Sequence, residues 1–380
     1  MWLAPPAPTP AFSGKPRRYD VAIAVPARDE AQSITTCLAA IDAAAGRAAA
    51  WLDTLVVVVS ANNCADDTVA IAKAFRPQAF RLVVDAVVLP ADRAHAGGAR
   101  RAALDLAARL LPAGGVLATT DADSAVAPDW LAALLAEFVR GADAVAGAIT
   151  LAPAERAQLP PLPGRDAEWQ LAERLAILEA LLDPLAHDPS PRHIWAWGAN
   201  FALSVAAYAT IGGLPVVPLA EDRALADVLL RHDLRLRRST APLVYTSARI
   251  VGRAPGGFAD LISGFANDCD LPCDAALEPV TAFVRRLRWR ARLRAVHAAM
   301  GRDATIVAAR PLLPEIHDLP MTGRFGALWA TIEAQSPMLV RQRLYPAQLA
   351  RELRNADRQI ARFKPAAANP ADNPAAAAAR

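Results

Sequence analysis

The sequence predicts an α/β protein with a mostly parallel central sheet, helices on both faces of that sheet, and a helical C-terminal region. Strand-like and helix-like segments alternate between residues 19 and 151. This order is typical of parallel strands joined by crossover helices. The segment 55–60 is dominated by β-branched residues, as expected for a strand buried on both faces. From about residue 256 the pattern is helical and rich in arginine.

Proline, glycine and aspartate set the expected ends of the alternating elements. The first strand ends at Pro26, and Pro112 with Gly114 closes the third helix. Asp66 or Asp67 lies near the start of the second helix, where aspartate is a favoured cap. We expect strands at 19–25, 55–60, 81–89, 116–120 and 144–151, and helices at 30–45, 66–75, 99–111 and 129–140.

Beyond residue 155 the alternation fades and helices predominate. An apolar stripe with helical spacing runs along one later segment, at Val280, Phe283, Val284, Leu287 and Ala291. We expect helices at 168–182, 221–232 and 342–362, and a strand-like segment at 234–245. The expected organisation is a disordered leader at 1–18, one domain at 19–250, a helical region at 251–364 and a disordered tail at 365–380.

Composition excludes several classes of protein. The chain has 380 residues, of which 54% are hydrophobic and 21% charged, so it is not disordered as a whole. The net charge of +3 is too small to indicate a nucleic-acid-binding protein. Four cysteines are too few for a disulfide scaffold, and the apolar runs fall short of the roughly 20 residues that a membrane-spanning helix needs. We therefore expect a cytoplasmic protein without a transmembrane segment.

Three polar clusters follow predicted strands of the sheet. They are 26–30 (Pro-Ala-Arg-Asp-Glu), 62–68 (Asn-Asn-Cys-Ala-Asp-Asp-Thr) and 121–124 (Asp-Ala-Asp-Ser). Ligands of open parallel sheets bind at the carboxyl ends of the strands. Each cluster alone is also compatible with an ordinary turn, but three on one edge indicate a binding site.

Asp121 and Asp123 form an Asp-x-Asp pair directly after a strand. Two carboxylates with this spacing can engage one hard divalent cation, Mg²⁺ or Mn²⁺, together with diphosphate oxygens. Such a cation would neutralise charge on a departing nucleoside diphosphate. The same pattern is also common in turns that bind no metal.

Taken together, the motifs resemble those of the inverting family 2 glycosyltransferases, which have the GT-A fold. The resemblance extends over about residues 19–250 and is carried by segments 25–30, 62–68, 97–100, 119–124, 128–130, 197–200 and 220–222. It implies a Rossmann-like sheet, with a nucleotide-sugar half at about 19–150 and an acceptor half at about 151–250. It also implies a soluble, non-processive enzyme that transfers a sugar from a nucleotide-sugar donor to an acceptor hydroxyl with inversion.

The resemblance places the donor along the first loops. It assigns Pro26, Arg28 and Glu30 to the nucleoside, although Glu30 is equally compatible with capping the following helix. Asn62 stands where the family usually has a base-reading aspartate, so a preference for uridine cannot be assumed. Asp66 matches a later aspartate of the same loop, with helix capping as its alternative role.

The remaining donor and metal residues lie further along the chain. Gly98 is expected to let the backbone approach a diphosphate, and Arg100 to pair with it; a solvated helix start is the alternative. Asp121 is expected to contact the donor, and Asp121 with Asp123 to hold the metal. Arg249 or Arg253 could also reach the diphosphate.

The resemblance assigns the catalytic base and the acceptor side to later motifs. Asp222 matches the general base best, and Glu221 is expected to orient the acceptor. Both acids are also compatible with simple charge complementarity at a helix N-terminus. Trp197 and Asn200 are expected to line the acceptor and donor sugar, although a buried tryptophan is more often part of a core.

The segment Arg285–Arg294 is a basic run that contains Trp289. A solvated helix face explains it most simply. The alternative is contact with an acidic acceptor or with an anionic membrane surface, which would place the protein peripherally at the inner membrane face.

Two other functions remain open from the sequence. The altered loop at Asn62 is compatible with a non-catalytic module of the same fold that binds nucleotide sugars or acts as a scaffold. Another nucleotide-using α/β enzyme is less well supported, because the chain lacks G-x-G-x-x-G after its first strand and lacks the P-loop pattern G-x-x-x-x-G-K-[ST].

Overall fold

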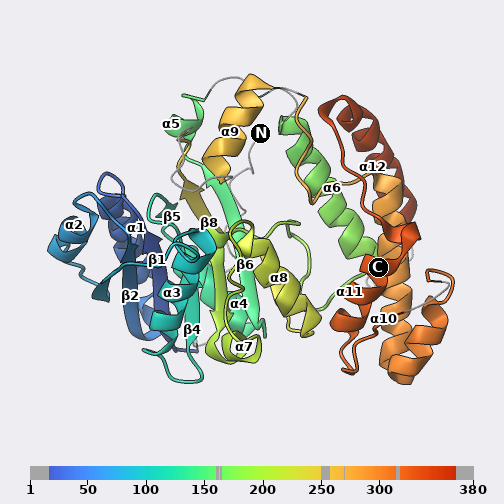
Figure 1. The fold of residues 1–380 in the computed structure, drawn as a ribbon, viewed down its shortest axis with the longest axis horizontal. Helices are drawn as coiled ribbons and strands as arrows, with labels where there is room; N and C mark the ends of the chain where they lie inside the picture. Colours follow the sequence, from blue (N-terminus) through green and yellow to red (C-terminus); the bar gives the residue numbers. More distant parts are fainter. Residues whose placement is uncertain are drawn as a thin grey trace, which may run out of the picture.

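The computed structural model describes residues 17–159, 162, 165–249, 257–268, 270–313 and 317–364. Within them, an eight-stranded sheet has the order β3-β2-β1-β4-β7-β6-β8-β5 (Figure 1). Its strands are β1 (Tyr19–Ala27), β2 (Leu52–Asn62), β3 (Arg81–Val87), β4 (Val116–Thr119), β5 (Ala125–Val126), β6 (Ala144–Leu151), β7 (Phe201–Ser204) and β8 (Leu236–Thr246). The strands predicted in the alternating part of the sequence are all present.

The sheet is parallel on one side and mixed on the other. Strand β1 pairs in parallel with β2 and β4, β2 with β3, and β6 with β8. Strand β7 lies antiparallel between β4 and β6, and β5 is antiparallel to β8. The sequence did not predict β7, because its four residues follow a tryptophan-rich segment without a strand pattern. Its insertion brings segment 198–200 to the centre of the sheet edge.

Helices cover both faces of the sheet. The helices of the described residues are α1 (Ile34–Arg47), α2 (Thr68–Ala74), α3 (Ala96–Ala108), α4 (Trp130–Val139), α5 (Pro153–Arg156), α6 (Arg165–Leu182), α7 (Val205–Thr210), α8 (Glu221–Arg231), α9 (Phe258–Asn267), α10 (Val280–Ala309), α11 (Phe325–Gln335) and α12 (Leu349–Phe363). Four short 3₁₀ turns accompany them: η1 (Ala49–Trp51), η2 (Gly198–Asn200), η3 (Pro337–Leu339) and η4 (Pro346–Gln348).

Alternate residues of the strands supply two separate cores. In β1, Val21, Ile23 and Val25 point to the face covered by α1 and α4, where Trp130 is fully buried. The neighbouring alanines of the same strand point to the other face, which α3 and α8 cover. This period of two is a property of extended backbone. Helices therefore cover the central strands on both faces, whereas the residues of the edge strand β3 are half-buried or exposed.

A second group of helices packs beside the sheet domain. Helix α6 lies against α10 and α12, and together they enclose a core that includes Leu171, Leu175 and Leu287 (Figure 1). Helix α6, from the earlier part of the chain, thus packs with helices that lie beyond residue 250 in sequence. The expected leader and tail fall mostly on 1–16 and 365–380, outside the described residues.

The last helix begins later than predicted. We expected a helix over 342–362, but α12 begins at Leu349. Pro346 opens the short turn η4 instead, and the residue that precedes a proline is disfavoured in the helical conformation.

A buried ionic cluster joins the sheet to the helical group. The carboxylate of Glu179 on α6 lies 2.6 Å from Arg192, 2.9 Å from Arg238 of β8 and 2.7 Å from Arg290 of α10. Asp188 contacts Arg192 and Arg238 as well. Burial opposes ionisation of Glu179, but the three arginines outweigh it and lower the pKa of the carboxyl group. The cluster therefore ties three elements together through fully ionised groups.

We expect Glu179→Gln to lower the free energy of unfolding by about 3–5 kcal/mol, because it removes the buried carboxylate that three arginines of the cluster share. Glu173→Gln is the matched control, since Glu173 is an exposed residue of the same helix and should change stability by less than about 0.5 kcal/mol. Chemical denaturation of both variants measures the difference. Equal stabilities would mean that the cluster does not join these elements.

Candidate functional site

Arg100 is the centre of a buried constellation at the carboxyl edge of the sheet. Its Nη2 lies 2.8 Å from Oδ1 of Asp121, and its Nε lies 3.1 Å from Oε1 of Glu221. Its Nη1 donates to the Thr119 hydroxyl and to the Gly198 carbonyl. One guanidinium thus gathers groups from β4, η2 and α8, which lie up to 121 residues from Arg100 in sequence.

The packing around Arg100 explains why position 198 is a glycine. A Cβ at Gly198 would lie 2.7 Å from the Arg100 guanidinium. Burial opposes the charge of Arg100, but Asp121 and Glu221 outweigh it and raise the pKa of the guanidinium. Arg100 therefore stays charged, and its fork holds the two carboxylates in fixed positions.

Asp222 lies beside this constellation at the start of α8. Its Oδ2 accepts from the Gly198 N–H at 3.1 Å, and its Oδ1 accepts from the Arg223 N–H at 2.7 Å. Burial and the neighbouring Glu221 raise the pKa of Asp222, although these two N–H groups oppose the shift. A fixed carboxylate with a raised pKa has the properties of a general base.

A second acidic group, formed by Asp123 and Glu30, lies at the same edge. Arg249 bridges them: its Nη2 is 2.8 Å from Asp123 Oδ2, and its Nη1 is 3.0 Å from Glu30 Oε1. Burial and the proximity of Asp121 and Glu30 raise the pKa of Asp123 to about 6, against the effect of Arg249. The edge therefore carries more negative charge than its arginines neutralise.

Asp121 and Asp123 have a donor set that fits a divalent metal. Both offer carboxylate oxygens, and each pairs with an arginine through one of its two oxygens. The side chain of Asp121 remains 35% exposed, so it is accessible from solvent. Hard oxygen donors together with uncompensated negative charge suit Mg²⁺ or Mn²⁺.

The first two loops are connected by aspartate side chains. Asp29 Oδ1 accepts from the Ala65 N–H at 2.7 Å, and Asp66 Oδ2 accepts from the Ala31 N–H at 3.0 Å. Asp29, Cys64 and Asp66 bring possible ligand atoms within 4.8 Å of one another. These hydrogen bonds already give the two aspartates a structural role in joining the loops.

The residues expected to read the base differ in exposure. Asn62 is buried, and its Nδ2 donates to the Ala27 carbonyl at 3.0 Å, which links the ends of β1 and β2. Arg28 is exposed and donates to the Ala94 carbonyl at 3.3 Å. Pro26 is half-buried within β1, opposite Ser60. Of the three, Arg28 is the most accessible to a ligand.

Gly98 lies at the first turn of α3, where the protein itself fills the space beside it. A Cβ at Gly98 would lie 2.1 Å from the Arg93 carbonyl oxygen, and the Gly98 N–H donates to His95 Nδ1. A Cβ at Gly97 would lie 2.2 Å from the Val217 carbonyl oxygen. Both positions must therefore be glycine, because the backbone at Arg93 and at Val217 leaves no room for a Cβ atom.

Trp197 and Asn200 occupy different surroundings. Trp197 is half-buried and stacks on His193 and Trp195, with ring centroids 5.2 and 5.1 Å apart. Asn200 is fully buried; its Oδ1 accepts from Trp130 Nε1, and its Nδ2 donates to the carbonyls of Ala148 and Pro242. Asn200 therefore has no exposed surface for a sugar in this arrangement, and it fixes η2 against the sheet.

The loops at this edge contain left-handed backbone. Asp29, Asn63 and Ala220 have φ values of 55°, 49° and 58°. Aspartate and asparagine tolerate the left-handed region, whereas for alanine this conformation costs about 1–2 kcal/mol. Ala220 immediately precedes Glu221 and Asp222, so the strained residue sets the direction in which the two acids enter α8.

Sequence reasoning identified most of these side chains but missed some of their connections. It did not identify Thr119 as a partner of Arg100, and it placed Arg249 near a diphosphate without its two carboxylate partners. The glycine at position 198 was the one sequence feature that could have indicated a large side chain, here Arg100, packed against the backbone. Arg253, the other arginine considered for the diphosphate, lies outside the described residues.

A comparison with protein families identifies the sheet domain. Residues 22–190 match the family described as Glycosyl transferase family 2. The chain carries a family 2 glycosyltransferase domain. This confirms the resemblance over residues 22–190, and the sheet has the predicted GT-A fold. No curated protein matches the chain.

Solved structures with similar folds have low sequence identity to the family 2 domain and its helical group. TarS 1–349 of S. aureus in complex with UDP is 15% identical, with 90% of each chain covered and a TM-score of 0.44. The mannosyltransferase PcManGT from Pyrobaculum calidifontis, in complex with GDP-Man and Mn²⁺, is 19% identical, with 87% and 88% covered and a TM-score of 0.43.

Glucosyl-3-phosphoglycerate synthase from Mycobacterium tuberculosis is 13% identical, with 71% of this chain and 78% of that chain covered and a TM-score of 0.38. In the part of the chain that the structure describes, no helix is both long enough and apolar enough to cross a bilayer.

We expect Gly198→Ala to lower the free energy of unfolding by about 1–3 kcal/mol, because the added methyl group displaces the Arg100 guanidinium. Gly46→Ala is the control, since nothing lies within 4 Å of a Cβ there and the site is helical. That variant should be neutral or slightly stabilising. Urea denaturation compares the two, and a Gly198 variant as stable as wild type would contradict the described packing.

Proposed function

We propose that the chain is an inverting glycosyltransferase that moves a hexosyl group from a nucleoside-diphosphate donor to an acceptor hydroxyl with the help of a divalent metal. The observation that carries the proposal is the connection of Asp121 to Glu221 through Arg100, with Asp222 directly beside it. A donor-side carboxylate and a base-side carboxylate are thereby held at one edge of the family 2 domain.

Asp222 is the proposed general base. Inverting transfer needs a group that removes the proton of the acceptor hydroxyl as the oxygen attacks the anomeric carbon. The two backbone N–H groups fix the orientation of the Asp222 carboxylate, and its raised pKa makes it a stronger base than an ordinary aspartate. Glu221 points to Arg100 instead, which supports a positioning role for it.

Asp121 and Asp123 are the proposed metal ligands. A bound Mg²⁺ or Mn²⁺ would stabilise negative charge on the nucleoside diphosphate that leaves. Arg100 keeps the Asp121 carboxylate in place while leaving its second oxygen available. Arg28 and Glu30 lie along the first loop on the proposed nucleoside side, in the half of the domain that we assign to the donor.

We expect Asp222→Asn to reduce kcat for sugar transfer by about 10²–10⁴-fold, the usual contribution of a general base. Binding of the nucleoside diphosphate, measured as a thermal shift with Mn²⁺ across a panel of nucleotides, should remain. Asp227→Asn is the control, because Asp227 is an exposed residue of the same helix. Full activity in the Asp222 variant would contradict the assignment.

The same base predicts the pH dependence of kcat. Asp222 must be ionised to accept a proton, so activity falls as the pH drops through its pKa. Because burial and Glu221 raise that pKa above the ordinary value of 3.8, the acidic limb should lie above pH 3.8. A pH–rate profile measures the limb, and a limb at or below 3.8 would argue for a different base.

A non-catalytic nucleotide-sugar-binding module is the second candidate. The bridge formed by Arg249 favours it, since an arginine already neutralises part of Asp123 and Glu30. Asn62 in place of an aspartate points in the same direction. Turnover of a nucleotide sugar by the wild-type protein would exclude this candidate, whereas metal-dependent binding without turnover would favour it.

If Arg249 competes with the metal for Asp123, Arg249→Ala should bind Mn²⁺ about fivefold more tightly, as expected for the loss of about 1 kcal/mol of competing ion pairs. Titration calorimetry with Mn²⁺ measures the affinity. Arg235→Ala is the control, because its partner Asp143 lies near the opposite end of β8. An affinity unchanged by Arg249→Ala would mean that the two cations use different atoms.

A further inference from the structure

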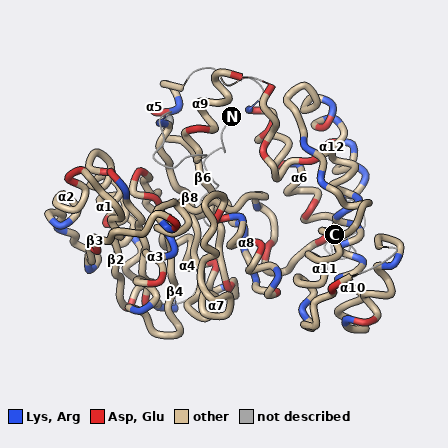
Figure 2. Tube along the Cα trace, viewed as in Figure 1, with Lys and Arg blue, Asp and Glu red and all other residues tan. Residues whose placement is uncertain are grey.

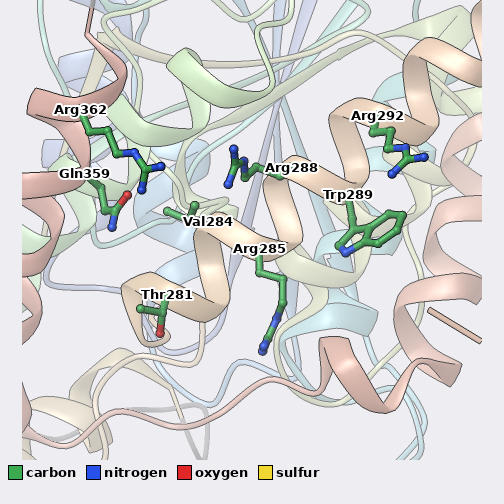
Figure 3. A pocket seen from close by; sticks show the side chains of 8 residues that line it. All are labelled: Thr281, Val284, Arg285, Arg288, Trp289, Arg292, Gln359 and Arg362. Atoms are coloured by element: carbon green, nitrogen blue, oxygen red, sulfur yellow. The ribbon is translucent and has the colours of Figure 1, made fainter. Parts of the chain in front are cut away.

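A basic groove lies between α10 and α12, outside the candidate active site. It has a volume of about 550 Å³ and is lined by Thr281, Val284, Arg285, Arg288, Trp289, Arg292, Gln359 and Arg362 (Figure 3). Gln359 and Arg362 reach from one helix toward Val284 and Arg288 of the other. None of the eight residues belongs to the constellation around Arg100.

Helix α10 carries two stripes of arginine with different environments. Arg286, Arg290 and Arg294 face inward and pair with carboxylates, Arg286 with Glu278 and both Arg290 and Arg294 with Asp183. These inward arginines are structural, because their charge is neutralised within the fold. They account for part of the basic run Arg285–Arg294.

The outward stripe has no such partners. Within the described part of the chain, no carboxylate pairs with Arg285, Arg288 or Arg292, nor with Arg362 of α12. Four like charges therefore share one concave surface, which is unfavourable unless a counter-charge is present. In Figure 2 the basic positions of α10 and α12 are visible as blue segments of neighbouring helices.

Aromatic rings support three of these guanidinium groups. Arg292 lies over Trp289 at 5.3 Å, while Arg288 and Arg362 lie over Phe363 at 5.6 and 5.5 Å. Cation–π contacts hold the arginines without neutralising them. The groove thus presents charged hydrogen-bond donors that are oriented in advance, as a site for an anion requires.

We propose that this groove binds a soluble ligand that carries a phosphate or pyrophosphate group, at a site separate from the proposed sugar-transfer site. Guanidinium groups match phosphate oxygens in geometry, and several around one cavity can engage a dianion together. A volume of 550 Å³ lies in the range of small-molecule sites. Gln359 adds a neutral donor and acceptor beside the arginines.

The shape of the groove favours a soluble ligand over a membrane surface. Membrane-binding faces combine basic residues with apolar side chains that enter the lipid. None of the strongly exposed large apolar side chains of the described chain lines this groove. The groove is instead a concave surface on which four arginines converge, which suits a discrete anion.

A second basic groove adjoins the first and shares Thr281 with it. It is lined by Pro279, Thr281, Gln342, Arg343, Gln348, Arg351, Glu352, Asn355 and Arg358. Its one acidic lining residue, Glu352, is buried and bonded to the Val280 N–H and to Arg351. A ligand whose phosphate binds in the first groove could therefore extend along α12 into the second groove.

Titration calorimetry of the full chain with inorganic pyrophosphate, in EDTA, tests the proposal. We expect binding that weakens with salt, and at least about tenfold weaker binding in Arg288→Gln/Arg292→Gln, which removes two donors from the groove. Arg109→Gln/Arg310→Gln is the matched control. It removes two equally charged, exposed arginines that lie outside the groove, so it should bind pyrophosphate like wild type.

Vesicles of phosphatidylcholine, with and without phosphatidylglycerol, provide the second arm. Pyrophosphate binding that depends on Arg288 and Arg292 supports the proposal whether or not vesicles bind. No pyrophosphate binding, or equal binding in the two double variants, would overturn it. Binding to anionic vesicles alone would also overturn it and identify a membrane contact. Sugar transfer does not enter this experiment, so its outcome is independent of the proposed activity.

Discussion

The buried guanidinium of Arg100 is the interaction on which the candidate site depends. It links the Asp-x-Asp side of the sheet edge to the acidic start of α8 through ion pairs with Asp121 and Glu221. Its rigid fork sets the separation of the two carboxylates, and Gly198 leaves room for it. A lysine could supply the charge but not this geometry. The Gly198 carbonyl accepts from Arg100 and the Gly198 N–H donates to Asp222, so the proposed base lies next to the same contact.

Much of the fold could be predicted from sequence, because local patterns determine it. The β-branched run in β2 and Pro112 after α3 define elements that the structure contains, although β1 continues through Pro26 to Ala27. Strand β7 could not be predicted in this way. It is four residues long, and its antiparallel pairing with β4 and β6 depends on contacts far away in the sequence. The predicted start of α12 was wrong, because the prediction followed the polar helical pattern and did not take account of Pro346.

The candidate site was predictable as a list of residues but not as an arrangement. Motif spacing indicates that Asp121, Glu221 and Asp222 belong together, whereas nothing in the sequence shows that Arg100 joins the first two. Asn200 illustrates the opposite case: its motif suggested a sugar contact, but burial and three hydrogen bonds give it a structural role. The hydrogen-bond partners of such a side chain depend on how distant segments pack together, and the pattern of a single sequence does not reveal that packing.

The ionic cluster around Glu179 has a consequence for how this chain can evolve. A helical region appended to a family 2 domain would be an exchangeable module if only a linker connected the two. Here Arg238 from the sheet and Arg290 from α10 share one buried carboxylate on α6. Replacing either part alone would leave buried charged groups without one of their ionic partners. The two parts must therefore be inherited and diversified as one unit, and a domain swap that cuts between them should not yield a folded protein.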